Sequence, residues 1–162
     1  MVDVHVTAFR LDGREYYVWW QNDDFAQDRV LARDGRVLWY QTGAECLTAG
    51  RALGLSVENE SEPVVPMDFD PAVAWAQGGG DDQVPAESAL NLWNFAGDVA
   101  RGTGVDWSDR NETLDSCYDK LVAINIPWLM GTEDALPTCS RAELSALRQT
   151  LADAATLIRQ AL

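Results

Sequence analysis

The stretch VHVTAFRLDGREYYVWW, residues 4 to 20, decides how the N-terminal part of the chain folds. From residue 2 to residue 9 the chain alternates apolar and more polar side chains, which is the period of a half-buried strand. The pair Asp12-Gly13 suits a two-residue primed turn, because both central residues of that turn need positive φ. The sequence therefore predicts an antiparallel hairpin in which EYYVWW, residues 15 to 20, is the returning strand.

The turn also predicts the register of this hairpin and assigns its aromatic side chains to faces. Tyr17 and Trp19 fall on the face of the first strand's valines and are predicted to be core. Tyr16, Val18 and Trp20 fall on the opposite face, together with His5, Thr7 and Phe9. Either the protein covers this second face itself, which we expect because large exposed apolar patches are uncommon, or Tyr16 and Trp20 bind a partner.

A second Asp-Gly pair at residues 34 and 35 joins RVLA (29–32) to RVLWYQ (36–41). Two such hairpins predict a four-stranded antiparallel sheet. Thr42 and Glu45 have the spacing of a capping box, so a short helix is expected there, ending at Gly54. LSVEN (55–59) is a candidate fifth strand.

The remainder of the chain is predicted to be a loop followed by helices. The acidic stretch 58–70 is expected to be a loop, with Asp70 as the N-cap of a small helix and the glycine-rich stretch 77–85 breaking that helix. Apolar spacing predicts helices over 86–101, with Gly102 as a stop, over 112–124, and from a capping box at Ser140 to the end.

These elements predict an α+β fold whose helical C-terminal half packs on one face of the N-terminal sheet. At 162 residues the chain is expected to form a single domain, 1–162. Within it, residues 1–60 are sheet-rich, 58–85 form the acidic and glycine-rich connection, and 86–162 are helical.

Charge is the strongest feature of the composition, because 26 acidic residues face 12 basic ones and give a formal net charge of -14. Such a field repels nucleic acid and anionic membranes and speeds encounter with a basic protein, although solubility alone would also favour it. Three cysteines without short spacing indicate neither disulfides nor zinc. With no signal-like N-terminus and no long apolar run, we expect a cytoplasmic protein.

The residue types that catalysis requires are sparse. His5 is the only histidine and Lys120 the only lysine, and neither is accompanied by a nucleophile motif. There is no glycine-rich phosphate loop and no twelve-residue calcium loop. The sequence therefore predicts no enzyme, no catalytic residue, no cofactor and no metal.

A binding surface for one protein partner is indicated instead. Trp107 lies among carboxylates in GVDWSDRNETLD (104–115), a composition suited to docking a basic partner, although acids at a helix N-terminus would look the same. The predicted partner-binding residues are Asp106, Trp107, Asp109, Glu112 and Asp115; Glu58, Glu60, Glu62, Asp68 and Asp70 of the acidic loop; and Tyr16 and Trp20 of the hairpin.

Three segments resemble a group of small bacterial proteins of toxin-immunity type: residues 29–58, 89–104 and 117–129. The similar elements are Leu90-Asn91-Leu92-Trp93-Asn94, Tyr118-Asp119-Lys120-Leu121 and Asn125-Ile126-Pro127. The resemblance implies a cytoplasmic inhibitor that binds and neutralises a cognate, basic toxin domain. It implies no site residues, since immunity surfaces differ between toxins. The alternatives are an acidic interaction or regulatory module without a toxin, and a small ligand-binding protein or carboxylate-based enzyme.

Overall fold

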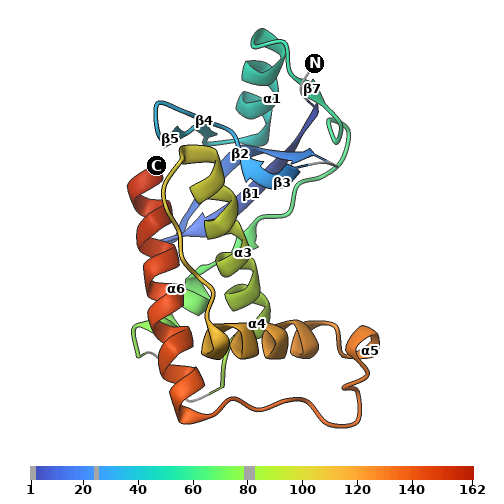
Figure 1. The fold of residues 1–162 in the computed structure, drawn as a ribbon. Coiled ribbons are helices and arrows are strands. Elements are labelled where there is room, and N and C mark those ends of the chain that lie inside the picture. The colour runs from blue at the N-terminus through green and yellow to red at the C-terminus, as the bar shows by residue number, and fades with distance from the viewer. Residues whose placement is uncertain (1–2, 24–25, 79–82) are drawn as a thin grey trace. The chain divides into compact units, whose positions relative to one another are not determined.

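The fold is α+β, as predicted, in a computed structural model that describes residues 3–23, 26–78 and 83–162 (Figure 1). The chain divides into two compact units. The sheet unit consists of residues 1–68, 95–107 and 157–162, and the helical unit of residues 69–94 and 108–156. The prediction of one domain over residues 1–162 stays a prediction.

The sheet unit contains the strands and the first helix, and two longer helices divide their residues between the units. The strands are β1 (Asp3–Leu11), β2 (Arg14–Asp23), β3 (Ala26–Val30), β4 (Ala32–Arg33), β5 (Arg36–Val37), β6 (Trp39–Tyr40), β7 (Ser56–Val57) and β8 (Met67–Asp68). The helices are α1 (Gly43–Ala52), α2 (Asp70–Ala76), α3 (Ala86–Thr103), α4 (Glu112–Asn125), α5 (Pro127–Met130) and α6 (Arg141–Ala161).

The first hairpin has the predicted register. β1 and β2 pair from His5 opposite Trp20 to Leu11 opposite Arg14. The turn residues Asp12 and Gly13 have φ values of 55° and 72°, as a two-residue primed turn requires. Local turn chemistry therefore fixes which side chains share a face.

The rest of the sheet differs from the predicted four antiparallel strands. The second Asp-Gly hairpin, β4 with β5, is a separate two-stranded sheet. Its flanking segments β3 and β6 both pair with β2, β3 near Trp20 and Gln21 and β6 at Tyr17 and Val18. Each of the two expected strands is thus divided, residues 29–32 between β3 and β4 and residues 36–41 between β5 and β6, and the turn at Asp34-Gly35 closes only two residue pairs.

On the side away from β2, β1 pairs with two short parallel strands, so the sheet is mixed. β7 pairs with residues 3 and 4, and β8 pairs with residues 9 and 10. Asn59 bridges the gap between them: its side-chain oxygen accepts from the Val6 N–H at 2.8 Å, and its amide nitrogen donates to the Val6 carbonyl at 2.8 Å. One side-chain amide therefore satisfies the backbone groups that a missing strand residue would have paired.

We expect Asn59→Asp to lower the free energy of unfolding by about 2 kcal/mol, because a carboxylate can accept from the Val6 N–H but cannot donate to the Val6 carbonyl. Urea unfolding followed by circular dichroism measures this change. Asn91→Asp, on α3, is the matched control and should have a smaller effect. Equal losses in the two variants would show that Asn59 does not substitute for a strand.

Helix α1 covers one face of the sheet (Figure 1). Its Cys46 joins Val4, Val6 and Trp19 in a buried cluster, and its Gly50 lies against the Trp19 indole. The predicted cap holds, since Thr42 accepts from the Glu45 N–H at 3.2 Å. The predicted stop holds too, because Gly54 has a φ of 71°.

The second half of α3 covers the opposite face, so this sheet has α1 on one side and part of the helical C-terminal half on the other. The Phe95 ring packs on Phe9, with ring centroids 4.7 Å apart. The Trp20 indole donates to the Asp98 carboxylate at 3.1 Å. The hairpin is apolar on both faces because each face of the sheet meets a helix.

Two helix limits differ from the predicted ones, the end of α3 and the start of α2. Gly102 lies inside α3 rather than after it, and Gly104, with a φ of 75°, follows the end of the helix. Asp70 is the first residue of α2 and not its N-cap. The position before it is Phe69, and the buried hydroxyl of Ser88 accepts from the Ala72 N–H at 3.1 Å, which supplies the partner that a capping side chain would have given.

The helical unit is held together by the apolar stripes of its helices. Leu147 and Leu151 of α6 are fully buried, as are Leu92 of α3 and Leu121 of α4. The predicted capping box of α6 forms between Ser140 and Glu143. The predicted break at 77–85 lies partly outside the described residues, which omit 79–82.

Candidate protein-binding surfaces

The acidic segment after β7 carries carboxylates that differ in their partners. A Glu58 carboxylate oxygen lies 2.7 Å from Nε2 of the His5 imidazole, and Glu60 forms an ion pair with Arg51. Glu62 is exposed and lines an open hollow of about 220 Å³ together with Glu60 and Asn59. Of the three predicted residues, Glu62 is therefore the carboxylate left for a partner.

The last two predicted acids of the segment belong to different units. Asp68 is exposed on β8, opposite Arg10 of β1, in the sheet unit. Asp70 is half-buried in the first turn of α2, in the helical unit. Its position suits the helix dipole, which favours negative charge there.

Tyr16 and Trp20 are committed to contacts within the sheet unit. The Tyr16 ring stacks on Phe9 at 5.1 Å between centroids and meets Trp39 edge-on at 5.0 Å. Trp20 is half-buried and donates to Asp98. The protein itself covers much of this hairpin face, so only the remaining exposed part of each ring could meet a partner.

The predicted cluster around Trp107 is divided between the units. Asp106 is exposed and Trp107 half-buried in the sheet unit, and the Trp107 indole nitrogen is buried without a hydrogen-bond partner among the described residues. In the helical unit, Asp109 accepts from the Trp93 indole at 2.8 Å.

The two remaining acids of this cluster lie at the start of α4. Asp115 pairs with Arg110. Glu112 is exposed, and no ion pair joins it to any described residue. Asp106 and Glu112 are thus the exposed carboxylates of the predicted cluster that are left for a partner.

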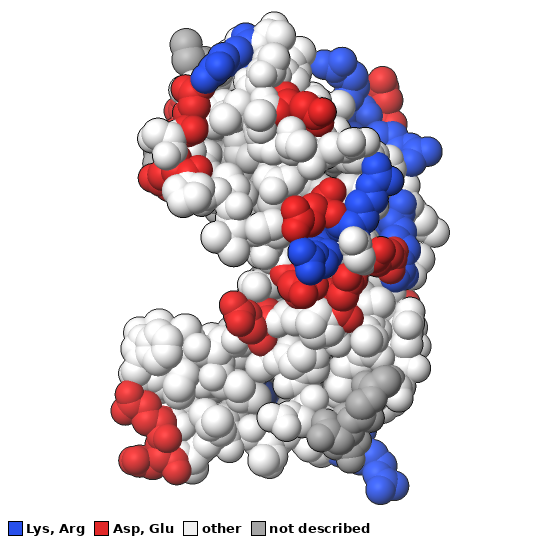
Figure 2. Space-filling view, turned by 180° about the vertical axis from the view of Figure 1, so that it is seen from behind, with Lys and Arg blue, Asp and Glu red and all other residues white. Residues whose placement is uncertain are grey.

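Figure 2 shows acidic side chains in separate groups over one face of the molecule, with basic side chains among them. Ion pairs between described residues engage basic side chains that include Arg10, Arg51, Arg101, Arg110, Lys120 and Arg159. Since acids outnumber bases by 26 to 12, most of the acidic surplus has no cation to neutralise it. The chain therefore carries an excess of negative charge, which on the face in Figure 2 is divided into separate groups.

A further surface was missed by the sequence analysis. The α5 surface consists of Trp128, Leu129, Met130, Glu133, Asp134 and Leu136. Trp128 is 68% exposed and Leu129 is 71% exposed, and both belong to a helix of four residues. No sequence signal pointed to it, because Trp128, Leu129 and Met130 are core residues by type and their place on a four-residue helix is known only from the structure.

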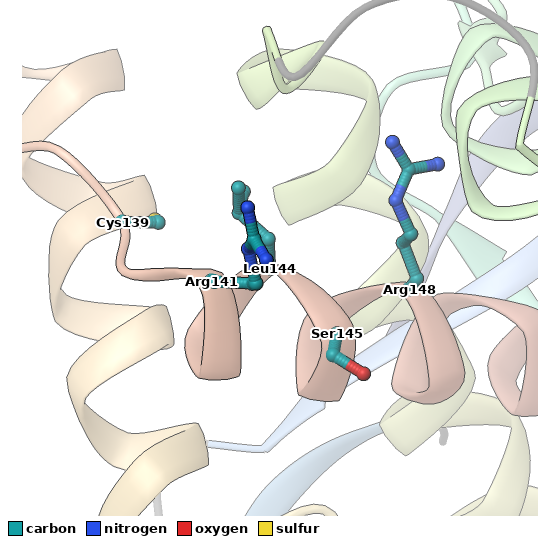
Figure 3. Close-up of a pocket in the computed structure, with 5 residues that line it drawn as sticks. All are labelled: Cys139, Arg141, Leu144, Ser145 and Arg148. Carbon is teal, nitrogen blue, oxygen red and sulfur yellow. The ribbon is translucent and has the colours of Figure 1, made fainter.

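A second hollow, of about 420 Å³, lies beside the start of α6 in the helical unit. Figure 3 shows Arg141, Leu144, Ser145 and Arg148 on the helix and Cys139 on the chain that leads into it. The Arg148 guanidinium lies 4.0 Å from the centre of the Trp75 ring and donates to the Trp75 carbonyl. Burial raises the pKa of the Cys139 thiol, which keeps it protonated at neutral pH.

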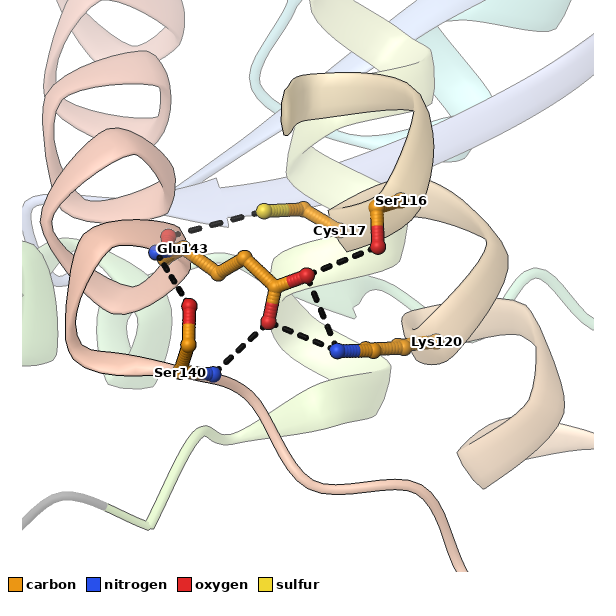
Figure 4. Close-up of polar contacts among 5 residues, drawn as sticks. All are labelled: Ser116, Cys117, Lys120, Ser140 and Glu143. Carbon is orange, nitrogen blue, oxygen red and sulfur yellow. Dashed lines mark hydrogen bonds and ion pairs between the residues drawn. The ribbon is translucent and has the colours of Figure 1, made fainter. Parts of the chain in front are cut away.

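The only lysine is part of a polar network between α4 and α6 (Figure 4). The Glu143 carboxylate accepts from the Lys120 ammonium at 2.7 Å and 2.9 Å, from the Ser116 hydroxyl at 2.7 Å and from the Ser140 N–H at 2.7 Å. These hydrogen bonds lower the pKa of Glu143 to about 2, and the bonds from Lys120 have the largest effect. The Glu143 carboxylate in turn raises the pKa of Lys120. Lys120 is therefore held as a charged structural partner.

The other two thiols are also unreactive by environment. Burial raises the pKa of Cys46 to about 12 and that of Cys117 to about 11. All three cysteines are free thiols. Since the thiolate is the nucleophile, these positions do not suit thiol chemistry.

Within residues 3–23, 26–78 and 83–162, no group of three or more His, Cys, Asp or Glu side chains is placed to hold a metal ion. In the same ranges, no helix has the length and apolar character needed to cross a bilayer. Comparison with protein-family models, curated proteins and solved structures found no match to this chain. Its function is therefore inferred from its surfaces.

Proposed function

We propose that this chain is an immunity-type inhibitor, which binds a cognate basic toxin domain in the cytoplasm and neutralises it by occlusion. The observation that carries the proposal is the surplus of exposed carboxylates that form no ion pair with a described residue. Asp106, Glu112 and Glu62 supply it at predicted positions, and Glu133 and Asp134 supply it on the α5 surface. A field of this sign speeds encounter with a basic protein.

The environment of the reactive side chains supports binding rather than catalysis. Lys120 is paired with Glu143, and His5 is paired with Glu58. The three thiols have raised pKa values. Groups that would act as a nucleophile or base thus have structural partners or stay protonated.

Co-expression with the protein encoded beside this chain's gene, followed by affinity capture, tests the proposal. We expect a stable complex, and we expect cells that produce the neighbouring protein alone to stop growing unless this chain is supplied. Failure to form a complex would overturn the proposal. A complex with a harmless neighbour would instead favour an acidic regulatory module without a toxin.

If the complex forms, its association rate should fall about tenfold between low and physiological ionic strength, because salt screens the attraction between the acidic chain and its basic partner. Stopped-flow fluorescence of the tryptophans measures this rate. The dissociation rate is the internal control and should change much less. An association rate independent of salt would contradict electrostatic steering.

A further inference from the structure

We propose that the α5 surface is the anchor of this interaction, and that it docks into an apolar pocket rimmed by lysine and arginine on the basic partner. The inference rests on the proposed function and names the contact surface and the partner's chemistry. Its central residue is Trp128, which the sequence analysis did not select.

Exposed apolar area is the first argument. Trp128, Leu129, Met130 and Leu136 are all exposed, and they lie within nine residues of one another in the chain. Single exposed apolar residues are ordinary, but several so close together in the chain, three of them on one short helix, indicate an interaction site. Tryptophan is also the residue type most enriched among those that carry binding energy.

The backbone of this segment is held in place, which favours its use as a preformed anchor. Pro127 begins α5, and Gly131 ends it in the left-handed conformation with a φ of 67°. The Thr132 N–H donates to the Pro127 carbonyl at 3.0 Å, and the Thr132 hydroxyl donates to the Ala123 carbonyl at 3.0 Å. A fixed anchor loses less conformational entropy when it binds.

Charge indicates which kind of partner binds the α5 surface. Glu133 and Asp134 are exposed, lie between Met130 and Leu136 in the chain, and form no ion pair with any described residue. No lysine or arginine occurs from residue 121 to residue 140. A partner surface with a basic rim therefore complements this surface.

A second copy of the chain fits less well. In a symmetric dimer the same patch meets itself, so Glu133 and Asp134 of each copy would approach those of the other. Each copy also carries a net charge of -14, which opposes the association. The basic partner is the occupant that the charges favour.

The test measures the dissociation constant of the complex with the neighbouring gene's product, by titration calorimetry. Trp128→Ser should weaken binding about thirtyfold, because truncating a central aromatic anchor removes much of the binding energy. Val65→Ser is the matched control, since Val65 is 81% exposed and lies outside the α5 surface. It should leave the dissociation constant unchanged, and thermal unfolding should be the same for both variants.

A pair of charge reversals compares the α5 surface with the surface predicted from the sequence. Glu133→Lys with Asp134→Lys and Asp106→Lys with Glu112→Lys change the net charge equally, so both alter the long-range field alike. Asp109 is left unchanged because it bonds Trp93. We expect the first pair to weaken binding at least about tenfold more than the second.

The outcomes separate this inference from the proposed function. A complex that tolerates Trp128→Ser, or that responds more to the reversals at 106 and 112, overturns the α5 surface and leaves the inhibitor proposal standing. Absence of any complex with the unchanged chain overturns the inhibitor proposal, and the α5 surface with it. Self-association that Trp128→Ser abolishes would assign the surface to a second copy and overturn the basic partner.

Discussion

Gly102→Ala should lower the free energy of unfolding by about 3 kcal/mol, the upper part of the range for overpacking a close contact. A Cβ atom built on Gly102 would overlap the backbone carbonyl oxygen of Val30 on β3. A Cβ atom and a backbone carbonyl oxygen cannot turn away from each other as the end of a long side chain can, so α3 and β3 would have to move apart. Urea unfolding followed by circular dichroism measures the change.

Gly97→Ala is the control, because Gly97 is a second glycine of α3 and is buried. A Cβ there would meet only the end of the Arg101 side chain, at 3.3 Å from a guanidinium nitrogen, so a shift of a few tenths of an ångström in that side chain accommodates it. Alanine has the higher helix propensity by about 1 kcal/mol, so this variant should be neutral or more stable. If both variants lose the same stability, the close approach of α3 and β3 is not what requires Gly102.

Glu143→Gln should cost about 3 kcal/mol of unfolding free energy at neutral pH, because it leaves Lys120 without its counter-ion and weakens the capping box of α6. The Glu143 side chain is 12% exposed, so solvent screens this ion pair only in part. The loss should appear in urea unfolding at neutral pH. Glu112→Gln makes the same change in the first turn of α4, at an exposed carboxylate, and should cost about 0.5 kcal/mol at most.

The stability difference between the unchanged chain and Glu143→Gln depends on pH in a definite direction. The network lowers the pKa of Glu143 from 4.5 to about 2, so the folded state favours the carboxylate. That stabilisation is complete above the ordinary pKa and is lost as the pH falls through the folded value. The difference between the unchanged chain and Glu143→Gln should therefore shrink between about pH 4.5 and pH 2. A difference that persists at low pH would contradict the role of the carboxylate.

Much of the local structure could be read from residues that are neighbours in the chain. Asp12-Gly13 predicts the turn and the pairing of β1 with β2, because positive φ at two adjacent positions admits few other conformations. Thr42 and Ser140 predict the starts of α1 and α6, because a capping side chain bonds amides three residues away.

The candidate site was predictable only in its residue types. Carboxylates in the acidic loop and around Trp107 could be counted from the sequence, but their partners could not. Asp109 bonds Trp93 and Glu58 bonds His5, and these partners are 16 and 53 residues away in the chain. Conversely, Trp128 and Leu129 look like core residues by type, and only their place on a four-residue helix leaves them in solvent.

The α+β class, the first hairpin with its register, the caps of α1 and α6 and the negative charge could be derived from the sequence, because each depends on local backbone preferences or on composition alone. The tertiary structure alone decided that β3 and β6 share an edge of β2, that Asn59 completes the other edge of β1, and that Gly102 meets Val30. It also determined which of the described carboxylates form ion pairs within the chain. These outcomes depend on which distant segments come into contact, and local preferences carry no information about that choice.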